Sequence, residues 1–480
     1  MDIAILRGPQ RLHGFSVMDV EELPPKQHVT KPMKIKKLLQ LTTALICTAT
    51  GMLTSASAQT ANNTLLRSRL ALGADNESIC AVGNTAYVAR DSAGLAIIDT
   101  TNPAAPVLKS TILPFAHAHF SDVQVIGNIA YISNEVPQGT PTPHVGMFIY
   151  DVSNPLAPVE LSRLEWGAGG GYHLGCDAHS VTVDVTTSGT FAYLTSGITG
   201  DVALFDVTDP ALPVYLSQII GPVLSYNCQA HDVVARNGRC YTTWLGGGFT
   251  VHDVSNPTAP VQLAYKPTSG INSEFFYHLA LSDDSQTLIT TGEITSSPDP
   301  VKLWNISNLA SITLAGSFAS PGGAIPHGIR VAGKYAYVAW LTDGLRILDI
   351  SNPASPRSVA QYDPEAGSGS SFVGGTDVAI SGNNVYLSHS SGGLYTLDFV
   401  DSITITRADW QRRNDRLVIE ATSSAAPSTS LTVAGYGVMT YNVSLGRYTL
   451  TVNGVTSNPG SVTVTSDIGG TRTSTVRRAN

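Results

Sequence analysis

The sequence predicts an all-β protein, and three observations lead to this fold class. Close copies of the turn Asp-Ile-Ser-Asn-Pro-Ala-Ser-Pro close one short strand, open the next, and recur along most of the chain. The segments between the copies alternate apolar and polar residues and are rich in β-branched residues and Tyr, as strands are. The 480 residues include 44 Gly and 27 Pro, which suits many short strands joined by tight turns. The copies of the turn begin at Asp99, Asp151, Asp206, Asp253 and Asp349.

One repeat unit, residues 327–356, shows how the strands are ordered. Three short strands are expected at 327–331, 335–339 and 345–349, with glycine-containing turns between them. The turn motif follows, and a fourth strand is expected over 357–362. Each unit is therefore predicted to be a four-stranded antiparallel meander.

Seven such units follow one another within residues 62–400. An aromatic residue or its counterpart in the second strand marks each unit, and these positions recur every 45–60 residues or so, about the period of four-stranded propeller blades. A four-stranded sheet cannot bury both faces alone, whereas seven sheets stacked radially can. The sequence thus predicts a seven-bladed β-propeller. The marking residues are Tyr87, Tyr131, Tyr193, Tyr241, Leu288, Tyr337 and Tyr386.

The N-terminal strand is predicted to close this propeller. The seventh unit stops after its third strand, near Asp398 and Phe399, and therefore lacks a fourth strand. The segment 64–72 precedes the first unit and is similar to the fourth strands at 107–113 and 159–164. We expect it to complete the last blade, because the ring would otherwise keep an open sheet edge.

The strand that precedes the turn motif resembles the LVIVD repeat. Residues 94–99 are Gly-Leu-Ala-Ile-Ile-Asp and residues 344–349 are Gly-Leu-Arg-Ile-Leu-Asp, and each is followed by the Pro-x-x-Pro turn. The resemblance extends over residues 64–400. It implies an exported bacterial or archaeal β-propeller, from a family whose members mostly have no assigned function.

The composition changes after Asp401, where a second domain is predicted. Residues 403–480 are rich in Thr, Ser and Val and are interrupted by glycines, which is typical of a small immunoglobulin-like β-sandwich. The segment contains no cysteine, so it would lack the usual disulfide between the two sheets. Strands are expected at 403–410, 416–422, 430–433, 448–452 and 461–465.

Residues 33–58 have the features of a secretory signal peptide that starts near Met33. Three lysines precede a largely apolar stretch, residues 38–53, and an Ala-Ser-Ala cleavage site stands before Gln59. Residues 1–32 are then interpreted as a misassigned upstream start. The mature protein is expected in the periplasm, at the cell surface or in the medium. An uncleaved membrane anchor is the alternative, and no other apolar run is long enough to span a membrane.

The charge of the chain bears on its partners. The formal net charge is −8, and the body of the chain holds no dense cluster of Lys and Arg. We therefore expect no nucleic acid partner. An exported chain of this kind would instead bind an extracellular ligand, a glycan or a protein.

Four histidines and one glutamate hold similar places in the repeat, at the start of the innermost strands. His231, His278 and His327 each stand ten residues before the marking residue of their unit. Alignment of the strands gives His179 and Glu77 the same position. In a propeller these first residues meet at one mouth of the central channel. Imidazole is a preferred protein ligand of Zn, Fe and Cu, so the five residues are candidate ligands of a transition metal.

A structural role is the alternative for these residues. The tripeptides at 231–233 and 376–378 are His-Asp-Val and Thr-Asp-Val, so a polar residue at this point belongs to the repeat pattern itself. Its side chain could hydrogen-bond the backbone of the neighbouring blade or line a wet channel. Both interpretations stay open from the sequence.

Two of the four cysteines that follow the signal segment stand in equivalent places. Cys176 and Cys228 each precede a histidine by three residues, in adjacent units. In an exported protein this pattern predicts a Cys176–Cys228 disulfide between two loops at the histidine mouth. Ligation of a metal by the thiolates is the alternative. Cys80 and Cys240 lie on strands of distant units and are expected to be buried and unpaired.

Two functional hypotheses follow. The first is a ligand-binding or protein-interaction scaffold, because the sequence shows no Ser-His-Asp order, phosphate loop or dinucleotide fingerprint and has long polar loops beside the histidines. The second is a metal-dependent enzyme of oxidoreductase or lyase type, with Zn, Fe or Cu held by the histidines and Glu77 as a ligand or base. No catalytic residue, substrate or oligomeric state can be assigned from the sequence.

Overall fold

The computed structural model is almost entirely β. Among the residues it describes there is no α-helix, and there are two short 3-10 turns, η1 (Leu341–Asp343) and η2 (Arg412–Asn414). The predicted signal segment 33–58 and the upstream residues 1–32 lie outside the described residues. The structure describes residues 60–73, 75–116, 118–135, 145–165, 178–196, 200–222, 228–269, 274–292, 299–319, 322–365 and 373–479.

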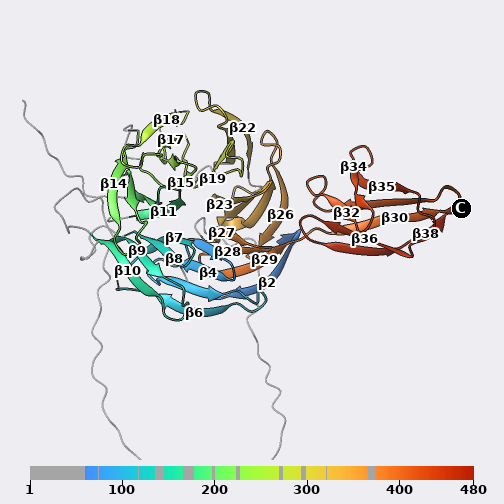
Figure 1. Ribbon diagram of the computed structural model, residues 1–480, viewed down its shortest axis with the longest axis horizontal. Helices are drawn as coiled ribbons and strands as arrows, with labels where there is room; N and C mark the ends of the chain where they lie inside the picture. The colour runs from blue at the N-terminus through green and yellow to red at the C-terminus, as the bar shows by residue number, and fades with distance from the viewer. Residues whose placement is uncertain are drawn as a thin grey trace, which may run out of the picture. The chain divides into compact units, whose positions relative to one another are not determined.

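Four-stranded sheets follow one another along the first four repeat units. In each sheet the strands pair antiparallel in chain order, as the repeat predicts. Figure 1 shows these sheets standing around a common centre, each with its first strand on the inside. The sheets are β3 (Ile79–Val82), β4 (Thr85–Ala89), β5 (Leu95–Asp99) and β6 (Val107–Ile112); β7 (Phe120–Ile126), β8 (Ile129–Asn134), β9 (Val145–Asp151) and β10 (Val159–Glu165); β11 (Ala178–Val185), β12 (Thr190–Ser196), β13 (Val202–Asp206) and β14 (Val214–Ile219); β15 (Val233–Arg236), β16 (Arg239–Thr243), β17 (Phe249–Asp253) and β18 (Val261–Lys266).

The last three units form three further sheets, and two of these recruit strands from the N-terminal side. Strand β1 (Thr60–Asn62) pairs with β26, and β2 (Thr64–Leu70) pairs antiparallel with β29, with Thr64 opposite Phe399. The strands of these units are β19 (Leu279–Leu281), β20 (Thr287–Thr290), β21 (Val301–Asn305) and β22 (Thr313–Phe318); β23 (Pro326–Ala332), β24 (Tyr335–Trp340), β25 (Gly344–Asp349) and β26 (Arg357–Asp363); β27 (Gly375–Ser381), β28 (Asn384–His389) and β29 (Gly393–Phe399).

Each sheet shares a hydrophobic core with the next sheet in the chain. Phe120 from β7 packs in one core with Leu95 from β5, and Trp304 from β21 packs with Phe249 from β17. The last sheet shares a core with the first in the same way, since Tyr386 of β28 lies in a cluster with Ile98 of β5. These side chains are almost fully buried, so every sheet buries both faces against its neighbours.

The C-terminal residues form two sheets around one core of their own. Trp410 and Leu417 of one sheet share this core with Leu431 and Val464 of the other. The five predicted strands are present with ends shifted by no more than two residues, and the short strands that complete the sheets were not predicted. One sheet is ordered β34 (Thr440–Asn442), β35 (Arg447–Asn453), β31 (Arg416–Ser423), β30 (Ile403–Gln411) and β38 (Arg477–Ala479); the other is ordered β33 (Gly437–Val438), β32 (Leu431–Val433), β36 (Ser461–Ser466) and β37 (Thr471–Thr475).

Candidate functional site

The predicted ligand residues stand where the chain enters the innermost strands, and hydroxyl groups of the preceding sheets hold their backbone. The Ser133 hydroxyl donates to the carbonyl of His179 at 3.0 Å, and the Thr195 hydroxyl donates to that of His231 at 3.2 Å. The Thr291 hydroxyl donates to the carbonyl of His327 at 2.9 Å. Each of these three histidines is therefore fixed by two sheets at once.

The four imidazoles lie side by side. The ring centroids of His179 and His231 are 4.2 Å apart, those of His231 and His278 are 5.2 Å apart, and those of His278 and His327 are 4.5 Å apart. These four residues, called the histidine row below, come from four successive sheets. The structure thus brings together the four histidines that were aligned from the turn motif.

The predicted position of His278 within its strand is wrong by one residue. The Tyr277 N–H donates to the Thr291 carbonyl just as the His231 N–H donates to the Thr243 carbonyl, so Tyr277 is the counterpart of His231. His278 instead takes the place of Asp232. The marking residue of this unit is accordingly Ile289, opposite Ala280, and not Leu288. The His278 ring still reaches the row because it extends between the rings of His231 and His327.

Three members of the row have an acceptor at Nδ1. His179 Nδ1 lies 2.7 Å from Glu135 Oε2, and His327 Nδ1 lies 2.6 Å from the carbonyl oxygen of Thr376. His278 Nδ1 lies 3.5 Å from Asp232 Oδ2. In a neutral ring, an acceptor at Nδ1 keeps the proton on that nitrogen. The lone pair of Nε2 is then available to a ligand, as in histidines that bind metals.

Two nitrogens of the row are buried and have no hydrogen-bond partner among the described residues. They are Nδ1 of His231 and Nε2 of His278. A buried polar atom without a partner costs about 1–3 kcal/mol. Such atoms in a contiguous group of imidazoles indicate a place where a ligand can bind.

Neighbouring members of the row differ in protonation. Burial opposes the charged form of His179, but the hydrogen bond and charge of Glu135, with further carboxylates nearby, outweigh it and raise the pKa of His179 to about 9. Burial, followed by the neighbouring histidines, holds the pKa of His231 well below its ordinary value. At neutral pH, His179 is therefore protonated and His231 is not.

Carboxylates surround the row. Glu77 takes the predicted position before β3, and burial raises its pKa against the opposing charges of His327 and His179. Asp91 lies 2.6 Å from His119 Nδ1, in a second pair of the same kind as His179 and Glu135. The carboxyl groups around the row make this mouth more favourable for a cation than for an anion.

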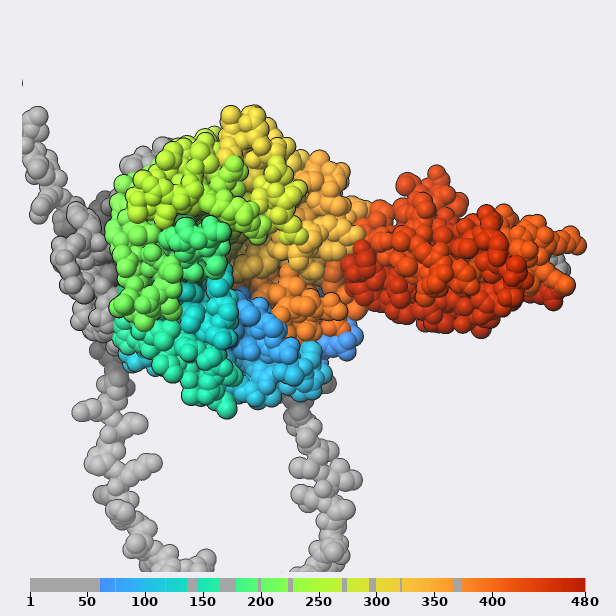
Figure 2. All heavy atoms as spheres, viewed as in Figure 1, coloured from blue at the N-terminus to red at the C-terminus, as the bar shows by residue number. Residues whose placement is uncertain are grey.

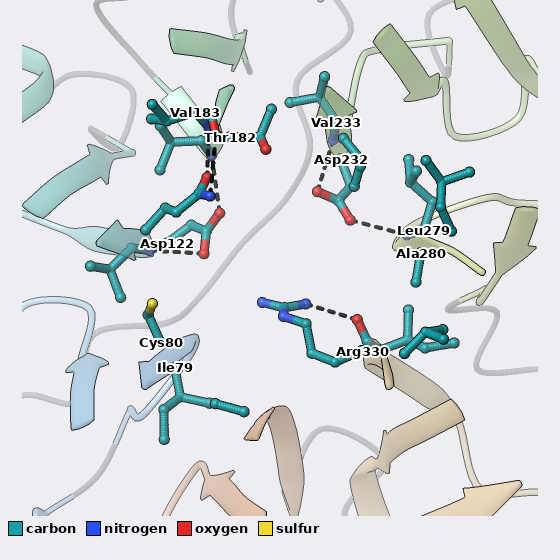
Figure 3. A pocket seen from close by; sticks show the side chains of 18 of the residues that line it. Ile79, Cys80, Asp122, Thr182, Val183, Asp232, Val233, Leu279, Ala280 and Arg330 are labelled. Atoms are coloured by element: carbon teal, nitrogen blue, oxygen red, sulfur yellow. Dashed lines mark hydrogen bonds between the residues drawn. The ribbon is translucent and has the colours of Figure 1, made fainter. Parts of the chain in front are cut away.

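A central chamber continues from the row along the innermost strands, with a volume of about 490 Å³. Its wall takes residues from β3, β7, β11, β15, β19, β23 and β27. Figure 2 shows the hollow between the sheets, and Figure 3 shows Asp122, Asp232 and Arg330 pointing into it.

Aspartates of this wall tie neighbouring sheets together. Asp122 accepts the N–H of Val181 at 3.0 Å, and Asp232 accepts that of Leu279 at 3.0 Å. The aspartates of the Asp-Val pattern therefore hydrogen-bond the backbone of the neighbouring sheet. This is the structural role that the sequence left open as the alternative for the histidines.

The described residues contain no group of three or more His, Cys, Asp or Glu side chains that is arranged to hold a metal ion. The candidate disulfide stays a prediction, because Cys176 lies outside the described residues. Cys240 is fully buried, as expected, whereas Cys80 is half-buried and lines the central chamber. Neither forms a disulfide with another described residue.

Comparison with known proteins supports the repeat. The family model of the LVIVD repeat matches residues 73–113, 229–264 and 325–364, which lie in the first, fourth and sixth units. The chain carries LVIVD repeats. The predicted resemblance to the LVIVD repeat is therefore confirmed. LVIVD repeats are associated with β-propeller proteins. None of the curated proteins compared with this chain matches.

Solved structures share the fold of the LVIVD-repeat chain at low identity. One is a catalytically inactive virginiamycin B lyase from Staphylococcus aureus with quinupristin, at 11% identity and a TM-score of 0.50, covering 70% of this chain and 99% of that one. A chain of the mitotic checkpoint complex has 12% identity and a TM-score of 0.50, covering 70% and 94%. The WD40 β-propeller domain of Doa1 has 12% identity and a TM-score of 0.48, covering 71% and 97%. With the repeats, the two likenesses at a TM-score of 0.50 support a β-propeller fold for the chain.

Over the residues that the structure describes, no helix has the length and the apolar character needed to cross a membrane.

Proposed function

We propose that this chain is an exported β-propeller that serves as a ligand-binding scaffold, and that the ligand binds at the histidine row. The proposal rests on the four neighbouring imidazoles of the row. Two of them have a buried ring nitrogen without a hydrogen-bond partner among the described residues. The hydroxyls of three preceding sheets fix the row, so the site is preorganised. Export rests on the predicted signal peptide at residues 33–58.

The scaffold is a ring of seven blades that the N-terminal strand closes. The pairing of β2 with β29 and the core between the last and the first sheet support closure. The hydroxyl of Ser68 in β2 also donates to the carbonyl of Pro103 at 2.6 Å, as serines of the other fourth strands do toward the next unit. The two sheets that share a core at residues 403–480 support an immunoglobulin-like sandwich, which would add a contact module to the ring.

The ligand is cationic or carries a cationic group. Glu77, Glu135 and Asp232 all interact with members of the row, and the whole chain has a net charge of −8. The negative potential of these carboxylates would repel an anionic ligand and attract a cation. An extracellular molecule, a glycan or a protein could supply such a group.

A metal-dependent enzyme of oxidoreductase or lyase type is the second candidate. It is favoured by the Nδ1 acceptors of His179, His278 and His327, which leave Nε2 to a transition metal such as Zn, Fe or Cu. Glu77 would act as a ligand or a base, because burial raises its pKa. The imidazoles would have to move closer together to share one ion, since no described group is arranged for it.

Metal titration tests both candidates at the same site. We expect Zn²⁺ to bind the purified protein in calorimetry, and His231→Ala and His278→Ala each to weaken this binding by about 100-fold, because each removes a nitrogen donor. His252→Gln is the control, since His252 is a buried histidine of β17 away from the row. Elemental analysis of the protein as purified then shows whether Zn, Fe or Cu is a resident ion.

The outcomes separate the proposals. A resident metal at one equivalent that both row variants lose supports the enzyme. Added metal that binds at the row without a resident ion supports the scaffold. If Zn, Fe and Cu all fail to bind, or bind the row variants as tightly as the wild type, the histidine row is not a site for cations.

A further inference from the structure

The central chamber carries an inference that does not depend on the histidine row. Its volume of about 490 Å³ lies within the range of small-molecule sites, roughly 300–1,000 Å³. Backbone and side chains of all seven innermost strands line it, so its shape is set by the packing of the sheets and not by loops.

Two carboxylates reach the chamber with spare hydrogen-bonding capacity. Asp122 accepts hydrogen bonds from the Ser78 hydroxyl and from the N–H groups of Val123 and Val181. Asp232 accepts from the N–H groups of Val233 and Leu279. A carboxylate can accept about four hydrogen bonds, so both can bind a further donor.

One guanidinium group faces these carboxylates across the chamber. Arg330 donates through Nη1 to the carbonyl of Ile329 at 2.9 Å and through Nη2 to Asp377 at 3.0 Å. The guanidinium carries five N–H donors, so others remain for a ligand, and 40% of the side chain is exposed to the chamber. Figure 3 shows Arg330, Asp122 and Asp232 directed toward the same space.

The chamber offers a ligand an acidic region at Asp122 and Asp232 and a basic region at Arg330. Arg330 is paired with Asp377. Among the ion pairs of the described residues, Asp122 has none and Asp232 has one, with His278. A purely anionic ligand would face the carboxylates of Asp122 and Asp232. A simple amine would leave the donors of Arg330 to water.

We propose that the central chamber binds a small zwitterion of the α-amino-acid class, with its ammonium group held by Asp122 and Asp232 and its carboxylate held by Arg330. The planar guanidinium binds a carboxylate through two parallel hydrogen bonds, which lysine at this place could not do. The site would recognise the ammonium and carboxylate groups of the ligand, and the side chain of the ligand would occupy the rest of the chamber.

Calorimetry with the twenty amino acids, one at a time, tests the proposal. At least one is expected to bind, and its analogues without the carboxylate or without the ammonium group are each expected to bind at least tenfold more weakly. Arg330→Gln should bind the amino acid and its decarboxylated amine equally weakly. Arg236→Gln is the matched control, because Arg236 also lines the chamber but donates to the Ser282 carbonyl at 3.1 Å.

The loss of the Arg330–Asp377 ion pair could also unfold the variant, so circular dichroism and a thermal melt accompany the titration. Asp122→Asn supplies a second variant, which should lose affinity for the amino acid and keep its preference for a ligand carboxylate. The proposal is overturned if no amino acid binds in the millimolar range. It is equally overturned if the amine analogue binds as tightly as the amino acid, or if folded Arg330→Gln binds like the wild type.

Discussion

His179 and His231 are adjacent in space but differ in their surroundings. His179 has Glu135 at 2.7 Å from Nδ1, whereas the Nδ1 of His231 is buried without a partner. The first ring is therefore charged at neutral pH and the second is neutral. Any metal bound through His179 must displace its proton, so metal affinity at the row should rise with pH up to about 9.

The pair of His179 and Glu135 also makes stability depend on pH. The pKa of His179 is about 9 in the folded protein against 6.5 for an ordinary histidine, so its contribution is complete below pH 6.5 and is lost as pH rises through 9. We expect wild type to lose free energy of unfolding relative to Glu135→Gln over this range, measured by urea denaturation. Glu420→Gln is the control, because Glu420 pairs with Arg407 and Arg447, which do not titrate there. Parallel pH profiles of wild type and Glu135→Gln would contradict the assignment.

Single residues also explain which parts of the site the sequence could predict. His179, His231 and His327 hold one place in the repeat and His278 lies one residue from it, so alignment of the repeats placed all four at the same end of the innermost strands. The one-residue error at His278 arose because the hairpin of its unit is longer: residues 283–286 separate the paired Ser282 and Thr287, whereas residues 237–238 separate the paired Arg236 and Arg239. Glu135 was missed because it follows β8 in a different unit, and no spacing within one unit connects it with His179.

At the level of strands and turns, the recurring motif does more than reverse the chain. Its Asp and Asn side chains accept backbone N–H groups two residues on, as Asp99 does from Thr101 and Asn102 does from Ala104. The carbonyl of its first proline accepts a hydroxyl from the fourth strand of the preceding unit. Ser110 donates to Pro155 at 2.7 Å in this way, and Ser162 and Ser217 do the same to Pro210 and Pro257. The turn was predictable, but this link between sheets was not, because the serine lies outside the motif.

A substitution at Gly316 tests the contact between the fourth strand and the turn of the next unit. This glycine holds the place of Ser110 in β22, opposite Leu303, and a Cβ atom there would overlap the carbonyl oxygen of Pro353. Gly316→Ala should therefore lower the free energy of unfolding by about 1–3 kcal/mol, because backbone must shift to make room. Ser110→Ala, which removes one hydrogen bond and adds no atom, should cost about 1 kcal/mol. The measurement is a denaturant titration, and an unchanged midpoint for Gly316→Ala would show that the sheets can separate here without cost.

At the level of the whole molecule, the cores between successive sheets account for the architecture. The order of the strands and the need for a strand to pair with β29 were readable from the sequence, whereas the continuous burial of second and third strands such as β8 and β9 was not. The wall of the central chamber was not, because Asp122, Asp232 and Arg330 lie in different units and face one another only once the sheets surround a common axis.

Removal of the N-terminal strands tests the proposed closure. A chain without residues 60–70 would leave the edge of β29 unpaired and expose Phe399 and Leu397, which are buried now. We expect its unfolding midpoint to fall by about 10 °C or more and the protein to form oligomers in size-exclusion chromatography. A chain that starts at Gln59 retains both strands and serves as the control. A deletion variant that melts like this control would mean that β2 is dispensable.

The pairing of β2 with β29 has a consequence for how the protein is made. Arg67 of β2 and its partner Asp398 are 331 residues apart in the sequence. During synthesis β2 leaves the ribosome first, yet its partner strand is among the last of the ring to appear. With synthesis at roughly 5–20 residues per second, β2 waits tens of seconds as an unpaired edge. The strands of the six sheets between are close together in the sequence, so we expect the docking of β2 onto β29 to be the last step of folding.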